Sequence, residues 1–354
     1  MIVPTVLAFG DVIDDIIVTP SGEVRPDTDT TATIERRAGG SAANAAAWFG
    51  RLGARTDFFG RVGTVDVVRH TEELEQAGVR AHLAGDDERP TGTIVVVLQA
   101  DRTRTMLTER GANALTGPAD VDRALLVPGA HLHLTGYSLF NDVPGSERLS
   151  AVRACAELIA EARDAGLSVS VNPGSAGFIA DHGAQTVLDA AHGATVLLPN
   201  LDEGRALTGL IDPDEVAVAL LEHAEVVALT MGRAGVLAAA RGADAPVLVR
   251  VPALLVDPVD TTGAGDAFSA GFVNSMLTTG TSGASGTPAR PFASGTVDAA
   301  RLDAAGRAGV RCAAVAIQQL GARPPHDLAG RLADPADPAD PGDPADPADP
   351  AGRP

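Results

Sequence analysis

Residues Val259–Phe272 read VDTTGAGDAFSAGF, and this stretch decides how the rest of the chain is interpreted. We expect residues 263–265 (GAG) to form a sharp turn, followed by Asp266 at the start of a helix of small and apolar residues. A helix N-terminus presents unpaired backbone N–H groups and a partial positive charge, so it binds anions such as phosphate. A carboxylate in the first turn can take the proton of a hydroxyl that attacks this phosphate. The alternative is that Asp266 is the N-cap of an ordinary helix.

The chain contains no lysine, so all 27 of its basic residues are arginine. Walker-type phosphate loops, protein kinases and pyridoxal phosphate enzymes each require a lysine, and the sequence excludes them. Phosphoryl transfer would therefore depend on backbone N–H groups, a metal ion and arginine. A nicotinamide-dependent dehydrogenase is also disfavoured, because the first predicted strand ends in Gly10-Asp11-Val12 rather than in GxGxxG.

Composition limits the class of protein further. The 354 residues are 45% apolar but only 3% aromatic, which favours an α/β core of small side chains. A net charge of −19 argues against nucleic acid or an anionic membrane as a partner. Cys155 and Cys312 lie in helix-like apolar runs, so we expect buried free thiols and a cytoplasmic location. No apolar stretch is long enough to cross a membrane.

Short apolar runs that indicate strands alternate with helical patterns along the chain. This alternation predicts an α/β fold with a doubly wound, mostly parallel sheet and helices on both faces. The predicted strands are residues 3–10, 130–134, 167–171, 195–198, 226–230 and 236–240, and the predicted helices include 42–52, 67–77, 147–165 and 214–223.

Two stretches, residues 28–37 and 91–108, are rich in β-branched residues and have no helix beside them. The second stretch predicts a hairpin that turns near residues 100–102. We expect strands from about residues 16–37 and 91–108 to form one small sheet, a lid over the C-terminal edge of the main sheet. Two unrelated surface hairpins are the alternative. Because a lid sheet leaves an apolar face and unpaired edges, we also expect a homodimer formed through these strands.

The end of the chain differs in composition from the rest. Residues 331–354 repeat Asp-Pro-Ala, with a proline at nearly every third position. Such a segment cannot continue a helix or bury a core, so it predicts a disordered tail. We therefore expect one domain over residues 1–330.

Three further motifs are weak when each is taken alone. The glycine pair of GGSAANAAA (Gly39–Ala47) permits close backbone approach, and Asn44 can offer a donor and an acceptor to a sugar hydroxyl. LTMGRAGV (Leu229–Val236) ends a strand in a glycine loop that can pass beneath a nucleotide. In LPNLDEGRALTG (Leu198–Gly209), Glu203 either caps a helix or positions a water bound to a metal ion.

The order of these motifs resembles the PfkB carbohydrate-kinase family of the ribokinase-like superfamily. GD…DD, GGSAAN, TG…GAN, NxxE, TxGxxG, DTTGAGD and LGARP follow one another over about residues 3–328. The resemblance implies a doubly wound sheet with a small β lid. It also implies transfer of the γ-phosphoryl group of ATP, with Mg²⁺, to an alcohol group of a sugar, nucleoside or similar small molecule.

Matching positions carry the family's roles onto this chain. The resemblance implies that Asp266 is the catalytic base and that the N–H groups beside it form an anion hole. The implied anion hole is Gly263, Ala264 and Gly265, and the implied substrate-binding residues are Asp15, Gly39, Gly40 and Asn44. The implied nucleotide loop is Thr230, Gly232 and Gly235, the implied Mg²⁺–phosphate motif is Asn200 and Glu203, and the positions that bind a monovalent cation such as K⁺ in some members are Asp260 and Thr262.

Two departures from the family pattern concern the acceptor and one helix cap. Ser41 occupies the position where ribokinases carry Lys, which disfavours ribose as the acceptor. Val68 stands where Gly is expected, at the start of a helix. The prediction is therefore an ATP-dependent, Mg²⁺-requiring kinase of a sugar or sugar-like molecule. A nucleoside kinase of the same family and a non-catalytic sugar-binding regulator are the alternatives.

Overall fold

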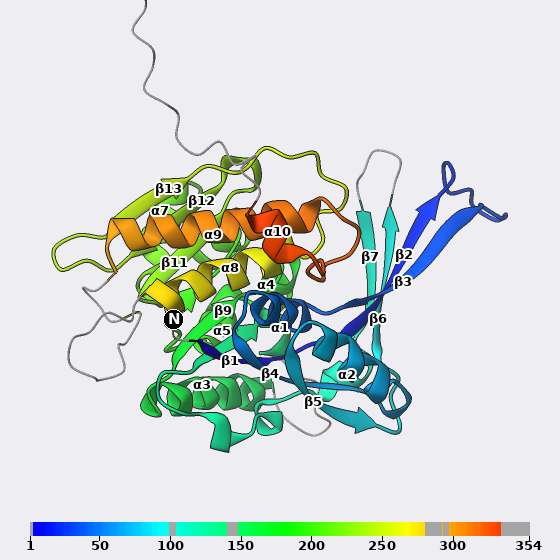
Figure 1. Ribbon diagram of the computed structural model, residues 1–354, viewed down its shortest axis with the longest axis horizontal. Coiled ribbons are helices and arrows are strands. Elements are labelled where there is room, and N and C mark those ends of the chain that lie inside the picture. Colours follow the sequence, from blue (N-terminus) through cyan, green and yellow to red (C-terminus); the bar gives the residue numbers. More distant parts are fainter. Residues whose placement is uncertain (1–2, 99–103, 140–147, 280–291, 293–296, 334–354) are drawn as a thin grey trace, which may run out of the picture.

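The computed structural model describes residues 3–98, 104–139, 148–279, 292 and 297–333. Its main element is a nine-stranded sheet in the order β13-β12-β11-β10-β9-β8-β1-β4-β5 (Figure 1). All neighbours from β5 to β11 are parallel, and β12 and β13 are antiparallel. The strands are β1 (Thr5–Phe9), β4 (Arg55–Gly63), β5 (Val79–Asp86), β8 (His131–Thr135), β9 (Ser168–Asn172), β10 (Val196–Leu197), β11 (Val226–Thr230), β12 (Val236–Ala240) and β13 (Val247–Val251).

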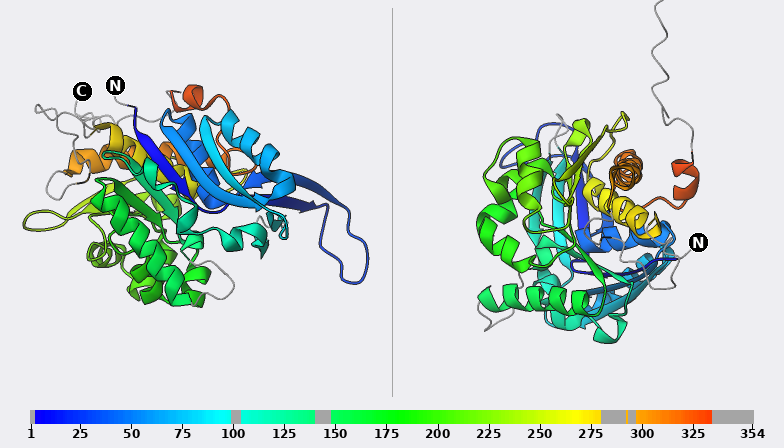
Figure 2. Two further views of the ribbon diagram at one scale, coloured as in Figure 1. Left: turned by 90° about the horizontal axis from the view of Figure 1, so that it is seen from below. Right: turned by 90° about the vertical axis from the view of Figure 1, so that its left-hand side faces the viewer.

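Helices cover both faces of this sheet (Figure 2). Helices α1, α8 and α9 pack on one face and α3, α5, α6 and α7 on the other, each through buried aliphatic and alanine side chains. None of the described helices is long and apolar enough to span a bilayer. The helices are α1 (Ser41–Arg51), α2 (Val67–Gln76), α3 (Arg148–Asp164), α4 (Ala176–His182), α5 (Ala184–Ala190), α6 (Leu201–Thr208), α7 (Pro213–Leu220), α8 (Ala264–Thr279), α9 (Ala299–Ile317) and α10 (Leu328–Leu332). Single 3₁₀ turns occupy Thr64–Asp66, Gly111–Leu115, Pro118–Asp120, Arg123–Leu125, Gly136–Ser138 and Gly232–Ala234.

The predicted doubly wound, mostly parallel sheet is confirmed, but three of its strands were not predicted. Strands β4 and β5 carry glycines and charged residues within their spans, and β13 alternates more and less exposed residues at the edge of the sheet. The mostly parallel sheet has an antiparallel edge that begins at β12. Only five residues connect β11 to β12, which is too short for a parallel crossover, so the two strands form a hairpin.

A second, four-stranded sheet projects from the body as a lid, in the order β3-β2-β6-β7 (Figures 1 and 2). The prediction of one small sheet is therefore confirmed, with β2 between the two predicted stretches. Strands β6 and β7 pair antiparallel as the expected hairpin, whose turn near residues 100–102 lies outside the described residues. The lid strands are β2 (Ile13–Pro20), β3 (Ala32–Gly39), β6 (Gly92–Leu98) and β7 (Arg104–Glu109).

The two faces of the lid differ in burial. Asp15 pairs in register with Ile94, so both point to the face that includes the buried Ile17 and Val96. The opposite face carries Ile16, Val18, Ile34, Val95, Val97 and Leu107, of which Ile34 is 65% exposed and Leu107 is 61% exposed. The face with Asp15 is therefore the one turned toward the body.

The boundary of the predicted tail falls inside a helix. Leu332 belongs to α10 and packs, partly buried, against the core that α8 and α9 cover. A truncation that begins at Leu332 would remove this contact, so the segment to delete begins at residue 334, and residues 334–354 lie outside the described part.

Deleting residues 334–354 is expected to leave the melting temperature and the kinetic constants unchanged, because the repeat has no apolar side chains larger than alanine and proline to bury. Differential scanning calorimetry of the two forms checks this. A matched truncation from residue 328, which removes α10 as well, should lower the melting temperature. A decrease of several degrees with the shorter deletion would show that the tail packs on the domain.

Candidate active site

Asp266 lies inside the first turn of α8, and its side chain reaches across to α1. Its carboxylate accepts hydrogen bonds from the Ser41 hydroxyl at 2.6 Å and from the Asn44 amide at 3.0 Å. The helix begins at Ala264, so the predicted turn at 263–265 is shorter than expected, and two of its residues are already helical. The interpretation of Asp266 as an N-cap is therefore wrong. The N-termini of α1 and α8 meet at one carboxylate.

The environment of Asp266 suits a proton acceptor. Burial raises the pKa of Asp266 to about 7, against the opposing hydrogen bonds from Ser41 and Asn44. The residue keeps part of its surface open to solvent, so a substrate can still reach it. A base with a pKa near 7 is both available at neutral pH and basic enough to accept a proton in the transition state.

Gly263 supplies the turn into α8, and no other residue fits there. Its φ is +76°, and a Cβ built on it would lie 2.3 Å from the Cβ of Ala322. The N–H groups that follow begin the helix, where backbone donors lack helical partners. Among the described residues, a long bond of 3.4 Å from the Ala264 N–H to the carbonyl of Thr261 occupies one of these donors.

Asp15 lies at the base of the lid beside the glycine pair. Its carboxylate fills the space where Gly39 would carry a side chain, since a Cβ there would lie 2.2 Å from Oδ2. Gly40 has a φ of +90°, with the backbone of Asp11 against it. Burial raises the pKa of Asp15 to about 7. The charges of Asp11 and of Arg323 act on both Asp15 and Asp266, so the two carboxylates belong to one cluster of charged groups.

The side-chain oxygen of Asn44 lies open beside Asp266. Its amide nitrogen binds Asp266, whereas its Oδ1 is buried without a hydrogen-bond partner among the described residues. A buried, unsatisfied oxygen is costly, and a hydroxyl group of a bound molecule would satisfy it. Of the donor and acceptor expected at Asn44, the donor binds Asp266 and the acceptor is open, and a role in binding a sugar hydroxyl stays a prediction.

Asp11 is a residue of the site to which the sequence assigned no role. Gly40 precedes α1 without a side chain, and Asp11 caps the helix instead by accepting the N–H groups of Ser41 at 2.8 Å and Ala42 at 3.2 Å. Thr135 donates to the same carboxylate at 3.2 Å. The sequence shows the Gly10-Asp11 pair after the first strand. It does not show that Asp11 caps a helix, because that helix begins 30 residues later and no local pattern links the two.

Asn200 and Glu203 form a capping box at the start of α6. The Asn200 side chain accepts the N–H of Glu203 at 2.9 Å, and the Glu203 carboxylate accepts the N–H of Asn200 at 2.9 Å. Burial raises the pKa of Glu203 to about 8, and the charge of Asp266 adds to the increase. The capping alternative is therefore present, and the role of the pair in binding Mg²⁺ stays a prediction.

A cavity of about 520 Å³ opens beside the start of α8. It brings the three predicted nucleotide-loop residues, Thr230, Gly232 and Gly235, together with two anion-hole residues. Gly235 has a φ of +90°, and a Cβ there would lie 2.0 Å from the carbonyl oxygen of Val251. Most of the remaining lining is apolar, and it includes Leu254, Val256, Phe268, Val310 and Ile317.

Asp260 and Thr262, the predicted cation positions, hold the loop that leads into Gly263. Thr262 donates to Asp260 Oδ1 through its N–H at 2.9 Å and its hydroxyl at 2.7 Å, and the Gly321 N–H donates to Oδ2 at 3.1 Å. Within the described residues, no group of three or more His, Cys, Asp or Glu side chains is arranged to hold a metal ion. A role in binding a monovalent cation stays a prediction.

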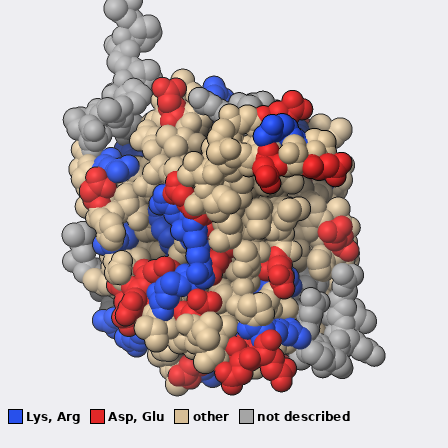
Figure 3. Space-filling view, turned by 90° about the vertical axis from the view of Figure 1, so that its right-hand side faces the viewer, with Lys and Arg blue, Asp and Glu red and all other residues tan. Residues whose placement is uncertain are grey.

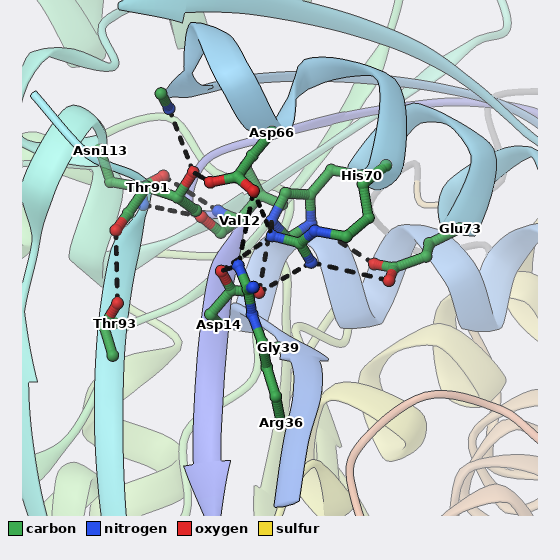
Figure 4. A network of polar contacts seen from close by, with 12 residues as sticks. Val12, Asp14, Arg36, Gly39, Asp66, His70, Glu73, Thr91, Thr93 and Asn113 are labelled. Atoms are coloured by element: carbon green, nitrogen blue, oxygen red, sulfur yellow. Dashed lines mark hydrogen bonds and ion pairs between the residues drawn. The ribbon is translucent and has the colours of Figure 1, made fainter.

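The lid is tied to the body by a polar network at its base (Figure 4). Asp14, which points away from Asp15, binds Arg36 of β3 and both terminal nitrogens of Arg69 of α2, the latter at 2.9 Å. Burial alone would raise the pKa of Asp14, but these hydrogen bonds outweigh it and the pKa is lowered. Thr91, just before β6, donates to Asp66 at 2.6 Å, and Asp66 also pairs with Arg69.

Basic and acidic side chains also alternate on the surface of the lid side (Figure 3). Arg36 with Asp66 and Arg37 with Glu35 are ion pairs of the lid and its base. Exposed pairs of this kind contribute little stability, but the partly buried Arg69–Asp14 pair fixes where the lid leaves the body. The network therefore holds the base of the lid against α2.

Known proteins resemble this chain in sequence and in fold. The sequence model described as pfkB family carbohydrate kinase matches residues 3–328. An ATP-dependent ribose-1-phosphate kinase from Halopiger xanaduensis is 31% identical over 270 residues, which are 72% of this chain and 79% of that protein. A fructokinase from Vibrio alginolyticus is 30% identical over 168 residues, or 46% of this chain, and the match spans about half (48%) of that relative.

A solved structure of a fructokinase from Vibrio cholerae, with fructose, ADP and a calcium ion bound, superposes with a TM-score of 0.70. It is 26% identical, and the match covers 93% of this chain and 99% of that chain. The likeness extends over the main sheet and the lid, because it covers nearly the whole of both chains.

Proposed function

Because the chain belongs to the pfkB family of carbohydrate kinases, we propose that it transfers the γ-phosphoryl group of ATP to a hydroxyl group of a sugar or sugar-like small molecule. One observation carries this proposal: the Asp266 carboxylate lies in the first turn of a helix whose N-terminus borders the apolar cavity, and it accepts a hydrogen bond from Asn44, whose oxygen has no partner among the described residues. This arrangement supports a base between a nucleotide-sized cavity and hydroxyl-binding groups.

The acceptor hydroxyl is held by Asp15 and by the free oxygen of Asn44, in reach of Asp266. Asp266 accepts the hydroxyl proton as the acceptor oxygen forms its bond to the γ-phosphorus and the bond to the β-phosphate oxygen breaks. The N–H groups of Gly263, Ala264 and Gly265 stabilise the negative charge of the transferring group. Ser41 and Asn44 keep the carboxylate oriented before the proton moves.

The residues fit a magnesium ion bound to the nucleotide. The charge of Asp266 raises the pKa of the buried Glu203 carboxylate, so a cation near the two carboxylates would stabilise both. Asn200 and Glu203 would hold the ion through water. When bound, Mg²⁺ neutralises phosphate charge as it develops.

A panel of acceptors tests the proposal. ADP release should be measured with ATP, Mg²⁺ and each of D-fructose, D-ribose, ribose 1-phosphate and adenosine. Turnover with a sugar supports the proposed class, and turnover confined to adenosine supports the nucleoside alternative. Binding without turnover, seen by calorimetry, would favour the non-catalytic regulator.

The pH dependence of the reaction follows from the pKa of the base. With a pKa of about 7, Asp266 is protonated and inactive in acid, so kcat/KM should decrease about tenfold per pH unit below pH 6 and level off above pH 8. Asp15 has a similar pKa and can only steepen the decrease. A profile that is flat from pH 5 to 8 would contradict the assignment of the base.

We further propose a homodimer formed through the outer face of the lid, where Val95 and Val97 lie beside the exposed Leu107. Val95→Glu and Val97→Glu should shift the protein toward the monomer, as measured by size exclusion with light scattering. Because these side chains point away from Asp15, acceptor affinity should change less than dimer affinity. Val218→Glu on α7, an exposed valine elsewhere, is the control. A wild-type monomer would remove the dimer proposal.

A further inference from the structure

The segment that joins α9 to α10 contacts both the loop that leads into α8 and helix α1. The Gly321 N–H donates to Asp260 at 3.1 Å, and the Trp48 indole of α1 donates to the Ala322 carbonyl at 2.9 Å. Gly263 packs directly against Ala322. Residues 321–323 therefore touch both the loop before the anion hole and the helix that carries the acceptor-binding groups.

Arg323 extends from this segment to the glycine pair. Its guanidinium donates to the Ala43 carbonyl at 2.6 Å and to the Gly39 carbonyl at 3.3 Å. Its Nε is buried without a hydrogen-bond partner among the described residues, and no carboxylate there lies within ion-pair distance of it. A buried guanidinium held only by carbonyls is costly, and burial lowers the pKa of Arg323 to about 10.

Acidic groups surround this cation at longer range. Asp11, Asp260 and Asp14 all raise the pKa of Asp15, and Asp11 raises that of Asp266, with Glu203 also coupled to Asp266. In the described part of the chain, two charges act on both Asp15 and Asp266. They are the negative charge of Asp11 and the positive charge of Arg323. His70 and Glu73 of α2 are further titratable groups whose charges couple to Arg323.

We propose that Arg323 is a positioning residue for phosphoryl transfer, which fastens the glycine pair to α1 and supplies the positive charge that faces Asp15 and Asp266. The inference rests on the proposed function, because it acts through the base and the acceptor-binding carboxylate. The proposal gives a role to Arg323 of the LGARP motif. Among the described residues, Arg323 neither lines the cavity nor forms an ion pair with a carboxylate.

The effect of the Arg323 charge on the ionisation of Asp266 can be tested without any substrate. The free energy of unfolding of the wild type and of Asp266→Asn, measured from pH 4 to 9, differs by an amount that follows the ionisation of Asp266. The same pair is then made with Arg323→Gln, which keeps an amide donor but no charge, and with Arg323→Lys, which keeps the charge. Arg51→Gln, at the far end of α1, is the matched control.

We expect Arg323→Gln to raise the pH at which this difference levels off by about half a unit to one unit, and Arg323→Lys and Arg51→Gln to leave it in place. In the ADP-release panel, Arg323→Gln should lose roughly two- to fivefold more activity between pH 8 and pH 6 than the wild type does. An unchanged pH dependence in folded Arg323→Gln overturns the inference, even if activity decreases at every pH. If the wild type phosphorylates none of the acceptors but Arg323→Gln still raises the pH at which the stability difference levels off, the proposed function fails and the charge role of Arg323 stands.

Discussion

Asp266→Asn is expected to lower kcat by about 10²–10⁴ while ADP binding and the fold remain, because the loss of a positioned general base has this effect on turnover. Asn keeps one acceptor oxygen, which can accept the bond from Asn44, and its NH2 group can donate to the Ser41 hydroxyl oxygen, so the local geometry should persist. ADP release and calorimetric titration with ADP measure the two quantities separately.

Stability provides an internal check on the same variant. The pKa of Asp266 is raised from 3.8 to about 7 on folding, so ionising it costs stability as the pH rises through this range. Asp266→Asn removes that cost, and its advantage in free energy of unfolding should grow from pH 4 to pH 7 and then level off. Asp298→Asn, at the N-cap of α9, is the matched control, since Asn caps a helix as well as Asp does. If Asp266→Asn kept more than about a third of the wild-type rate, Asp266 would not be the base.

Gly263→Ala should lower kcat by about 10²–10³, the usual effect of losing an oxyanion-type donor, and should also destabilise the fold. The added methyl group meets Ala322 at 2.3 Å, and the φ of +76° is unfavourable for alanine. The turn must move, and the N–H groups of the anion hole move with it.

The control for this variant is Gly209→Ala. Gly209 ends α6 with a φ of +72°, and a Cβ there meets nothing within 4 Å. This variant therefore carries the same backbone penalty without the collision. A kcat equal to that of Gly209→Ala would mean that the turn at Gly263 is not part of the catalytic apparatus. Steady-state kinetics and thermal melts of both variants decide the point.

The sequence by itself determined the features that depend on neighbouring residues. The glycine turn and helix of residues 259–272 predict an anion site, and the alternation of strands and helices predicts the doubly wound sheet. The hairpin of β6 and β7 followed from β-branched composition. These patterns are local, because the turn at Gly263, the start of α8 and the pleat of a strand are set by residues a few positions apart.

Only the tertiary structure decided which distant groups meet. Ser41 binds Asp266 from 225 residues away, Asp11 caps α1 across 30 residues, and Arg323 reaches back to Gly39. The antiparallel edge at β12 depended on a connection too short for a crossover. The pKa values near 7 arise from the exclusion of water and from charges brought in by other elements. Long-range pairing and desolvation are properties of the packed chain, so no local pattern encodes them.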